Sequence, residues 1–343
     1  MGSKRQRGLC DFQDRMREIG EKDPLARLHD VVDWEAFRSP IEKAVVPEPK
    51  GPGGRPRFDA IIMLKVLVLQ RLYHLSDAQT EFMIRDRLSF MRFVGVDLHE
   101  PIPDEKTIWR FKEELIAGRV MDKLWKAFDG ELKRLGVQTS RGKIVDASIV
   151  ESTSKPRKKS RDEETEETTE EQNPHRERQI DGEARSTMKR KRWYFGYKNH
   201  IKIDAGTKLI VADTVTDAAV HDRKMLPVLL SDDDKDCDVY ADKGYAGVGP
   251  KSEVIAVEAI PRIMHKGKRN KPVTTGQKTE NKQWAKIRSR VEHVFGDQHT
   301  GMHLTKIRTR RKTRAEFTIR LNNLAYNLRR LGFLLQQPGF VTG

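Results

Sequence analysis

Five short segments rich in β-branched residues constrain the fold of this chain more than any other feature. Each is bounded by Gly, Asp or Pro, as strands commonly are. They are KIVDASIV (143–150), YKNHIKID (197–204), KLIVADTVT (208–216), CDVYAD (237–242) and VEAIPRI (257–263). Helical segments follow the third strand (221–230) and the fifth (280–296). This order predicts a mixed α/β domain, with a five-stranded mixed sheet flanked by helices, at 138–335 and a short tail at 336–343.

An all-α domain is predicted at 58–137, ahead of the sheet. Residues 1–57 are weakly patterned and end in PEPKGPGGRPR, so we interpret them as an N-terminal arm and linker. The segment 60–75 is mostly apolar and predicts a buried helix. Ser76, followed three residues later by Gln79, is typical of a capping box at the start of the next helix.

A third helix is predicted after Asp104, its candidate N-cap. Three apolar residues share one face of it, Ile108, Phe111 and Leu115. The other side is polar and includes Lys106 and Arg110. Such a helix either reads DNA from the major groove, as in a helix-turn-helix, or packs in an ordinary bundle. The sequence leaves both interpretations open.

A charged insertion separates the first two predicted strands. Residues 155–192 run from basic (KPRKKSR) through acidic (DEETEETTEE) to basic again (MKRKR), with almost no apolar side chains. The burial of so few apolar groups cannot offset the entropy lost on ordering. The segment is therefore predicted to be disordered, or ordered only on binding.

The net positive charge of the chain is concentrated in one block. The 343 residues have a formal net charge of +15, and residues 262–330 alone hold 19 Lys or Arg against 4 Asp or Glu. Such a block suits a polyanion, most commonly nucleic acid, whereas a mobile basic tail would lack the regularly spaced apolar residues found here. The stretch KIRTRRKTR (306–314) is predicted to lie along phosphates, through Lys306, Arg308, Arg310 and Arg311.

Composition excludes several other classes of protein. No stretch approaches the roughly 18 uncharged apolar residues of a membrane span. The N-terminus lacks the apolar segment of a signal peptide, so a cytoplasmic location is expected. Two cysteines, Cys10 and Cys237, are too few for a disulfide framework or a thiolate zinc site.

Three carboxylates stand at unusual places. Asp146 interrupts an apolar strand, Asp242 ends another, and Glu292 lies on a helix dense in Arg and Lys. Singly, each has an ordinary explanation, as a hydrogen-bonded Asp, a turn Asp and an i,i+4 partner of Arg288. A carboxylate in a buried strand is costly, however, unless it is paired or binds a metal, and a few carboxylates are what hold Mg²⁺. Together the three predict a site for metal-assisted phosphodiester chemistry.

The order of these elements resembles the RNase H-like fold of DDE transposases, and more specifically the insertion-sequence-five group of bacterial DDE transposases. The matching stretches are KIVDASIVES, WYFGYKNHIKIDAGTKLI, DAAVHDR, VYADKGYAG and RSRVEHVFG, with a further likeness from GRPRFDAIIMLKVL to PDEKTIWRFKEEL. The resemblance covers roughly residues 50–335. It implies that the chain binds the terminal inverted repeats of an insertion sequence, cleaves the DNA at its ends, and joins the 3′-hydroxyl to target DNA.

The resemblance also implies which residues act. Asp146, Asp242 and Glu292 fall on the catalytic triad, which binds Mg²⁺, with Mn²⁺ as a substitute. DDE transposases generally act on paired DNA ends, so a homodimer on DNA is expected.

Arg288 matches an Arg that contacts the DNA backbone in the family. Two nearby positions depart from the family pattern, because Ala285 stands where the family has Tyr and His299 where it has Lys. The phosphate contact of the missing Lys is then expected from protonated His299 or from Lys306.

Other family matches give weaker candidates. The resemblance implies that Lys198, His200 and the pair His221-Asp222 lie near the active site, where they orient substrate or contact DNA, although a structural histidine is an equal alternative. Trp193 stands beside MKRKR and is of the kind that stacks a displaced base, with packing in the core as the alternative.

These observations predict a Mg²⁺-dependent DNA transposase. Two rivals stay open. One is a protein that binds inverted repeats without cutting them, against which the presence of all three carboxylates speaks. The other is an RNase H-like nuclease that only hydrolyses DNA.

Overall fold

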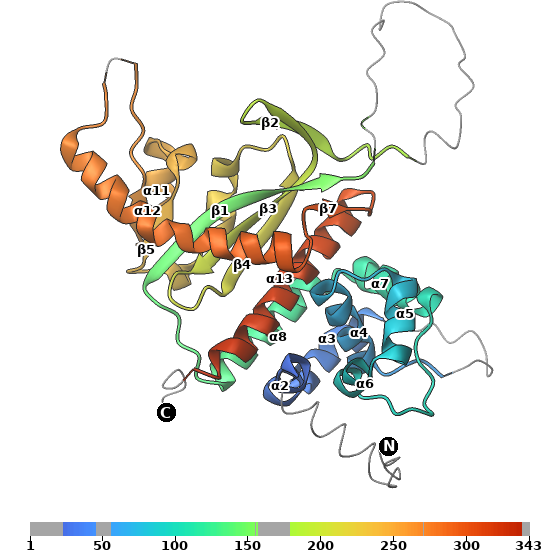
Figure 1. Cartoon of the computed structure of the whole chain (residues 1–343). Coiled ribbons are helices and arrows are strands. Elements are labelled where there is room, and N and C mark those ends of the chain that lie inside the picture. The colour runs from blue at the N-terminus through green and yellow to red at the C-terminus, as the bar shows by residue number, and fades with distance from the viewer. Residues whose placement is uncertain (1–22, 46–55, 155, 157–178, 270, 338–343) are drawn as a thin grey trace, which may run out of the picture. The chain divides into compact units, whose positions relative to one another are not determined.

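The structure is a computed structural model that describes residues 23–45, 56–154, 156, 179–269 and 271–337 (Figure 1). The chain divides into two compact units. The first unit comprises the residues up to Gln138 together with those from Leu328 onward, and the second comprises residues 139–327. The predicted end of the sheet domain at 335 therefore differs from the structure, because the last residues of helix α13 (Lys312–Leu334) cluster with the first unit.

The first unit is helical. Its elements are α2 (Pro24–Val31), η1 (Trp34–Phe37), α3 (Arg38–Ala44), α4 (Ala60–Leu72), α5 (Asp77–Asp86), α6 (Leu88–Val94), α7 (Glu105–Ala117) and α8 (Met121–Arg134). Helix α4 is buried along most of its length, as its apolar sequence predicts. The capping box of Ser76 and Gln79 begins α5, and Asp104 caps α7 by accepting a hydrogen bond from the Thr107 amide at 2.7 Å.

The prediction that residues 1–57 form only an arm and linker was wrong for 24–44. Three short helical elements lie there, and their apolar side chains, including Leu28, Phe37 and Ile41, are buried in the helical unit. Asp23 and Asp33 begin two of them by accepting backbone hydrogen bonds. Elements of four to eight residues are too short to give a clear helical period in the sequence. The rest of the predicted arm and linker, 1–22 and 46–55, lies outside the described residues.

The predicted two faces of α7 are confirmed. Ile108, Phe111 and Leu115 are buried, whereas Lys106 and Arg110 are exposed. The polar side is not uniformly available, because Lys112 is held by both oxygens of the Asp77 carboxylate, at 2.6 and 2.8 Å.

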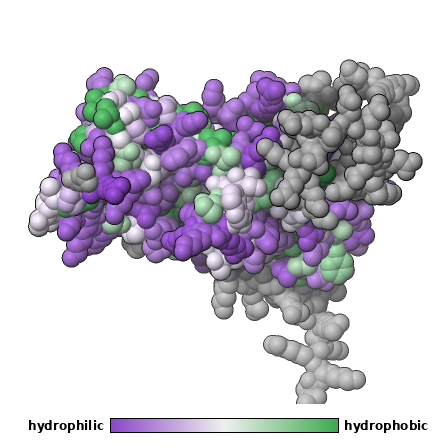
Figure 2. Space-filling model, turned by 90° about the horizontal axis from the view of Figure 1, so that it is seen from above, coloured by the Kyte–Doolittle hydropathy of each residue, from purple (hydrophilic) through white to green (hydrophobic). Residues whose placement is uncertain are grey.

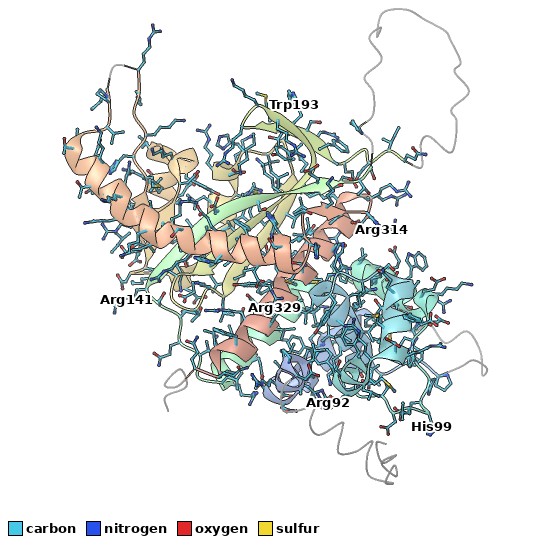
Figure 3. The ribbon with its side chains drawn as sticks, in the orientation of Figure 1. Arg92, His99, Arg141, Trp193, Arg314 and Arg329 are labelled. Carbon is cyan, nitrogen blue, oxygen red and sulfur yellow. The ribbon has the colours of Figure 1, made fainter. Side chains whose placement is uncertain are left out.

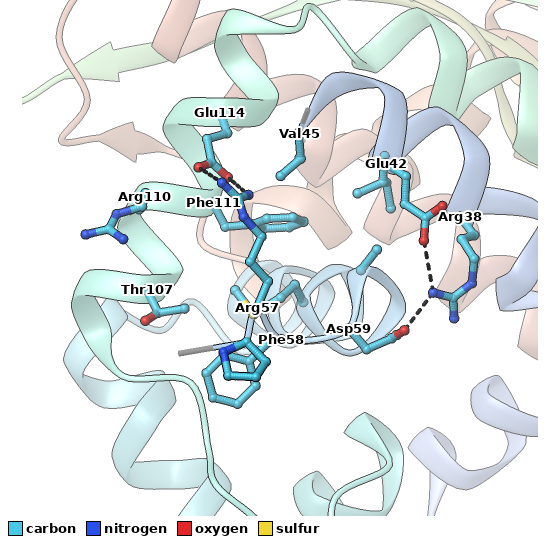
Figure 4. Close-up of a pocket in the computed structure, with 14 residues that line it drawn as sticks. Arg38, Glu42, Val45, Arg57, Phe58, Asp59, Thr107, Arg110, Phe111 and Glu114 are labelled. Carbon is cyan, nitrogen blue, oxygen red and sulfur yellow. Dashed lines mark hydrogen bonds and ion pairs between the residues drawn. The ribbon is translucent and has the colours of Figure 1, made fainter. Parts of the chain in front are cut away.

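A pocket of about 450 Å³ opens between α3, α4 and α7 (Figure 4). Arg57 donates two hydrogen bonds across it to Glu114, at 3.0 and 3.1 Å. Arg38 contacts Asp59 at 2.6 Å, while Asp59 also accepts the first free amides of α4. In Figure 4 the Arg110 guanidinium points away from the Arg57–Glu114 pair. These ion pairs fix the chain where it enters α4.

The second unit is built on a mixed sheet. Its strands are β1 (Gly142–Ser152), β2 (Arg185–Lys189), β3 (Arg192–Asp204), β4 (Ile210–Asp217), β5 (Asp238–Ala241), β6 (Ile260–Ile263) and β7 (Lys306–Ile307). Strands β1, β3 and β4 pair antiparallel, while β5 pairs parallel to β1 and β6 parallel to β5. All five predicted strands are confirmed. The structure adds two further strands. Strand β2 pairs with the beginning of β3, and β7 pairs with the end of β1.

Helices cover both faces of this sheet (Figure 1). One core packs Val145 and Val239 against α10 (Leu226–Leu229) and α11 (Val248–Ala256). The other packs Val150 and Tyr197 against the start of α13. Helix α12 (Thr275–Gly296), which begins with a capping box at Thr274, lies on the α13 side. The predicted mixed α/β architecture, with helices flanking the sheet, is confirmed.

The prediction that 155–192 is disordered was wrong for its last part. Strand β2 pairs with β3, from Arg185 opposite Gly196 to Lys189 opposite Arg192. Before it, the Tyr197 hydroxyl donates to the buried Asp181 at 2.8 Å. Backbone pairing along a neighbouring strand needs little apolar burial of its own, so composition gave no sign of it. Residues 155 and 157–178 of the insertion lie outside the described residues.

A buried amide network ties the sheet to α13. Asn323 donates to Asn199 on β3 and to Asp213 on β4, and it accepts hydrogen bonds from Asn199 and Gln298. These four contacts span 2.7 to 3.0 Å, and Asn323, Asn199 and Gln298 are fully buried. Because each polar group in the network serves the others, removal of one leaves several without a partner.

We therefore expect Asn323→Ala to lower the free energy of unfolding by about 3 kcal/mol, since buried groups left unpaired cost about 1–3 kcal/mol each. Thermal denaturation followed by circular dichroism measures the loss. Thr313→Ala, at an exposed position of the same helix, is the control and should change little. A loss below 1 kcal/mol for Asn323→Ala would show that the network contributes little.

Candidate active site

Asp146 lies within β1, opposite Ile201 of β3, on a strand that is otherwise largely apolar. Its Oδ1 accepts a hydrogen bond from the Ala147 amide at 2.8 Å. Burial raises the pKa of Asp146 to about 6, an effect that the nearby charge of Asp242 adds to and that Arg288 opposes. The sheet thus holds a carboxylate where its charged form is disfavoured, which is common at functional sites.

This burial makes a prediction about stability. The folded pKa of about 6 lies above the ordinary value of 3.8, so the folded protein holds the proton more tightly and its stability falls as the pH rises from about 4 to 6. Asp146→Asn removes this penalty and is expected to raise the free energy of unfolding at pH 7.5 by about 2 kcal/mol.

Thermal denaturation in the presence of a chelator, at pH 7.5 and at pH 4, tests this. The gain should be present at pH 7.5 and close to zero at pH 4. Asp238→Asn is the control, because Asp238 on the adjacent strand is paired with Arg262 at 2.7 Å and should give no such gain. Equal melting temperatures of Asp146→Asn and wild type at pH 7.5 would contradict the prediction.

Arg288 bridges Asp146 to Glu292. Its Nη1 lies 2.8 Å from Asp146 Oδ2 and its Nη2 lies 2.7 Å from Glu292 Oε1. Arg288 and Glu292 are four residues apart on α12, so they share one side of that helix. Side chains of both Asp146 and Arg288 are 20% exposed, whereas that of Glu292 is 63% exposed. The guanidinium therefore lies over β1, a central strand of the sheet, between a recessed carboxylate and an exposed one.

Asp242 directly follows β5, whose neighbour in the sheet is β1. It caps the short helix η4 (Lys243–Tyr245) by accepting a hydrogen bond from the Gly244 amide at 2.7 Å. A Cβ at Gly244 would lie 2.9 Å from Asp242 Oδ1, so glycine is what lets this carboxylate sit over the turn. The charge of Asp242 raises the pKa of Asp146, which places the two carboxylates within electrostatic reach of each other.

The donor chemistry of these carboxylates suits a hard divalent cation. Their arrangement is different, however, from that of a ready metal site. Among the described residues, no three His, Cys, Asp or Glu side chains are close enough together to hold a metal ion. The space between Asp146 and Glu292 is taken by the Arg288 guanidinium instead.

His299 and Lys198 both make contacts inside the protein. His299 Nε2 lies 2.7 Å from Ser148 Oγ, and burial lowers its pKa. A phosphate contact by protonated His299 at neutral pH is therefore not supported. Lys198 forms an ion pair with Asp222 at 2.8 Å and donates to the Val220 carbonyl at 2.7 Å. Its side chain is 11% exposed, and these two contacts attach Lys198 to the loop that contains Val220 and Asp222. A DNA contact by Lys198 stays a prediction.

The two histidines that match family motifs differ in exposure. His200 is fully buried, hydrogen-bonds Thr216 through Nε2, and has its pKa lowered to about 4 by burial. It is therefore neutral at physiological pH, in line with the structural alternative. His221 is exposed and caps the turn that begins at Asp222, accepting a hydrogen bond from the Arg223 amide at 3.4 Å.

The predicted phosphate-binding stretch begins with β7, which pairs with the end of β1 at Glu151. The four side chains predicted to contact phosphates, Lys306, Arg308, Arg310 and Arg311, are all exposed. The stretch thus begins beside the strand that holds Asp146. The surface in Figure 2 is largely hydrophilic, with scattered hydrophobic residues.

The hairpin of β2 and β3 has an unusual tip. Met188 and Trp193 face each other across the two strands, and they are 60% and 68% exposed. Four basic residues lie between them, with Arg190 and Lys191 in the turn and Lys189 and Arg192 at the strand ends beside it. In Figure 3 Trp193 lies at the end of this hairpin. The core-packing alternative for Trp193 is therefore excluded.

Sequence reasoning missed two residues near the carboxylates. The charge of Lys189 lowers the pKa of both Asp146 and His299, so the hairpin reaches the surroundings of the site. Tyr245 is buried, its hydroxyl has no hydrogen-bond partner among the described residues, and burial raises its pKa. The KGY after Asp242 was a visible signal for Tyr245. Lys189 lies in the basic segment MKRKR, but nothing in the sequence shows that this segment folds back toward Asp146.

Comparison with known proteins supplies the family. Residues 13–114 match the family model described as "Transposase domain (DUF772)", and residues 138–328 match the one described as "Transposase DDE domain". A chain from the solved "Cryo-EM structure of piggyBac transposase synaptic complex with hairpin DNA (SNHP)" aligns with a TM-score of 0.43 at 10% identity, covering 94% of this chain and 77% of that one. A likeness this low supports no inference about this chain.

No helix in the described part of the chain is long and apolar enough to cross a membrane. The resemblance found in the sequence is confirmed, and the second match alone spans more than half of the 343 residues. With its carboxylates on β1, after β5 and on α12 of a mixed sheet flanked by helices, the chain belongs to the DDE transposase family.

Proposed function

We propose that this transposase binds the terminal inverted repeats of an insertion sequence and cleaves the DNA at its ends. Water attacks the phosphorus at the element's end and the bond to the 3′-oxygen breaks, which leaves a 3′-hydroxyl and a 5′-phosphate. The freed 3′-hydroxyl then attacks a phosphodiester of the target and displaces the target's own 3′-oxygen. The observation that carries this proposal is the buried Asp146, linked through Arg288 to Glu292 and electrostatically to Asp242.

Asp146, Asp242 and Glu292 would hold Mg²⁺, or Mn²⁺ in its place, which when bound activates the attacking hydroxyl and stabilises the leaving oxygen. Asp146 stands in β1 and Asp242 directly after the neighbouring strand β5, while Glu292 belongs to α12. The Gly244 amide orients the Asp242 carboxylate. Such fixed positions reduce the reorganisation that the reaction requires.

Basic side chains would place the DNA against these carboxylates. The exposed stretch from Lys306 to Arg311 is suited to the phosphate backbone, and Arg288 offers a guanidinium beside the carboxylates themselves. In the helical unit, the exposed Lys106 and Arg110 of α7 are suited to contacts with the terminal repeats. A homodimer on paired ends and a location on cytoplasmic DNA stay predictions.

We also propose that the hairpin tip contacts an unpaired base at the DNA end. An exposed Trp beside four basic residues combines a stacking surface with phosphate attraction. Trp193→Ala is expected to weaken binding to DNA with an unpaired end by about 1–3 kcal/mol, the usual value of one stacked base. Fluorescence anisotropy with labelled DNA measures this change.

Two controls make the result specific. Val248→Ala removes another exposed apolar side chain, 84% exposed, and should leave the affinity unchanged. Fully paired blunt DNA should lose less affinity than DNA with an unpaired end. Equal affinity of Trp193→Ala and wild type for the unpaired end would contradict the proposal.

One assay separates the proposed function from its rivals. The protein is incubated with Mg²⁺, labelled duplex carrying the terminal repeats that flank its gene, and a supercoiled target plasmid. A transposase gives cut ends with a 3′-hydroxyl and products joined to the plasmid. A nuclease gives the cut ends alone, and a binding protein gives a shifted complex without cuts. The absence of joined products under conditions that give cut ends would overturn strand transfer.

A further inference from the structure

The Arg288 guanidinium occupies a position that a divalent cation needs. It contacts Asp146 at 2.8 Å and Glu292 at 2.7 Å, and these are two of the three carboxylates of the proposed triad. A guanidinium and a metal ion cannot both lie between the same two oxygens. For as long as this double ion pair persists, the Arg288 side chain prevents Asp146 and Glu292 from sharing a metal ion.

The electrostatics of the site make the double ion pair favourable. Asp146 is recessed and lies within reach of the Asp242 charge, so it gains from a nearby cation. Arg288 supplies that charge from α12, and its planar fork can serve two carboxylates at once. In the absence of DNA, the arginine therefore neutralises the cluster that a metal would otherwise neutralise.

The same guanidinium also matches a phosphate. Arg binds phosphate with two parallel hydrogen bonds, and Arg288 stands in the block (262–330) whose net charge equals that of the whole chain. It is 20% exposed, next to a Glu292 side chain that is 63% exposed, so the pair lies at the surface where DNA would arrive. A phosphate there would compete with Asp146 and Glu292 for the arginine.

We propose that Arg288 is a latch that couples metal binding to DNA binding. In the DNA-free protein it holds Asp146 and Glu292 and excludes the metal, and a DNA phosphate draws it away and frees the carboxylates. This inference rests on the proposed function, because it assumes that the carboxylates bind metal. It assigns Arg288 a role in the resting protein as well as on DNA. Arg288 is thus a positioning residue whose removal has opposite effects on the two ligands.

Metal affinity of the DNA-free protein tests the latch. Binding of Mn²⁺ is measured by electron paramagnetic resonance for wild type, Arg288→Gln and Arg288→Lys. Arg288→Gln is expected to bind Mn²⁺ about tenfold more tightly than wild type, because a charge-assisted contact to carboxylates no longer competes. Arg288→Lys retains the charge without the fork, so its affinity should lie between the other two.

Arg290→Gln is the matched control. It removes the same charge from the same helix, but Arg290 donates to the Ala205 carbonyl at 2.7 Å rather than to the triad. General electrostatics would give the two Gln variants equal gains in Mn²⁺ affinity, whereas the latch requires a gain for Arg288→Gln alone. Melting temperatures identify any variant that does not fold, in which case Arg288→Lys decides.

A second series adds a saturating duplex of random sequence, with the Mn²⁺ bound by the duplex alone subtracted. DNA should raise the Mn²⁺ affinity of wild type and of Arg290→Gln, and it should raise that of Arg288→Gln much less, since linkage between two ligands is reciprocal. Unchanged or weaker Mn²⁺ binding by DNA-free Arg288→Gln would overturn the latch and leave the proposed function intact. Failure of every protein to bind Mn²⁺, with or without DNA, would overturn both.

Discussion

Asp146→Asn, Asp242→Asn and Glu292→Gln are each expected to lower the rate of end cleavage by roughly 10³-fold or more. The reason is that each variant removes one negative oxygen from a set of only three carboxylates, and metal-based charge stabilisation is worth several kcal/mol, at 1.36 kcal/mol per factor of ten. The substitutions keep the shape of each side chain, so the fold should persist. Affinity for terminal-repeat DNA should stay within a few-fold of wild type.

Cleavage of labelled terminal-repeat DNA under single-turnover conditions measures the rate, and anisotropy measures the affinity. Two controls alter the same residue types on the same elements. Asp238→Asn lies on β5, four residues before Asp242, and Glu280→Gln lies on α12, three turns before Glu292. Both should cleave at close to the wild-type rate. Cleavage by any triad variant at more than a tenth of the wild-type rate would remove that residue from the triad.

The second large effect concerns salt. If the basic surface contacts six to ten phosphates, DNA affinity should fall by about 10³ to 10⁵ between 50 and 200 mM salt. Each phosphate contact contributes about 0.9 to the slope of log affinity against log salt. A variant with Ala at Lys306, Arg308, Arg310 and Arg311 should therefore lower the magnitude of that slope by about 3 to 4. Its affinity at low salt should fall by several orders of magnitude.

Anisotropy titrations at four or more salt concentrations give the slope. The control replaces Lys235 and Lys251, which lie outside the basic block, with Ala and should leave the slope unchanged. If the four-residue variant had the same slope as wild type, the stretch 306–314 would not contact DNA phosphates. The basic charge would then have to act through other parts of residues 262–330.

The strands and the carboxylates were predictable because their signals are local. A β-branched segment bounded by turn residues needs only its own composition to be recognised, and Asp146 stands out because it interrupts such a segment. The capping box at Ser76 likewise depends on residues three apart. The prediction of the two faces of α7 is confirmed for the same reason, because the spacing of its apolar residues is a local pattern.

Other features depend on contacts that no local pattern encodes. Ser148 and His299 are 151 residues apart, and Arg288 lies 142 residues from Asp146, so neither contact is visible before the chain folds. Strand β2 has the composition of a disordered segment, and its order comes from pairing with β3. The ion pair of Lys198 on β3 with Asp222, 24 residues later, likewise depends on the fold.

The recessed position of Asp146 has a consequence for copies of such an element that acquire mutations in a genome. If Asp146 acts as proposed, a copy in which it mutates to a neutral residue would lose DNA cleavage but, by the pKa of about 6, would gain stability at physiological pH. The basic stretch proposed to bind DNA would be unchanged. Decayed copies would then accumulate as folded proteins that occupy the element's ends without cutting them, so that inactivation by this route turns an active gene into a repressor of its own relatives.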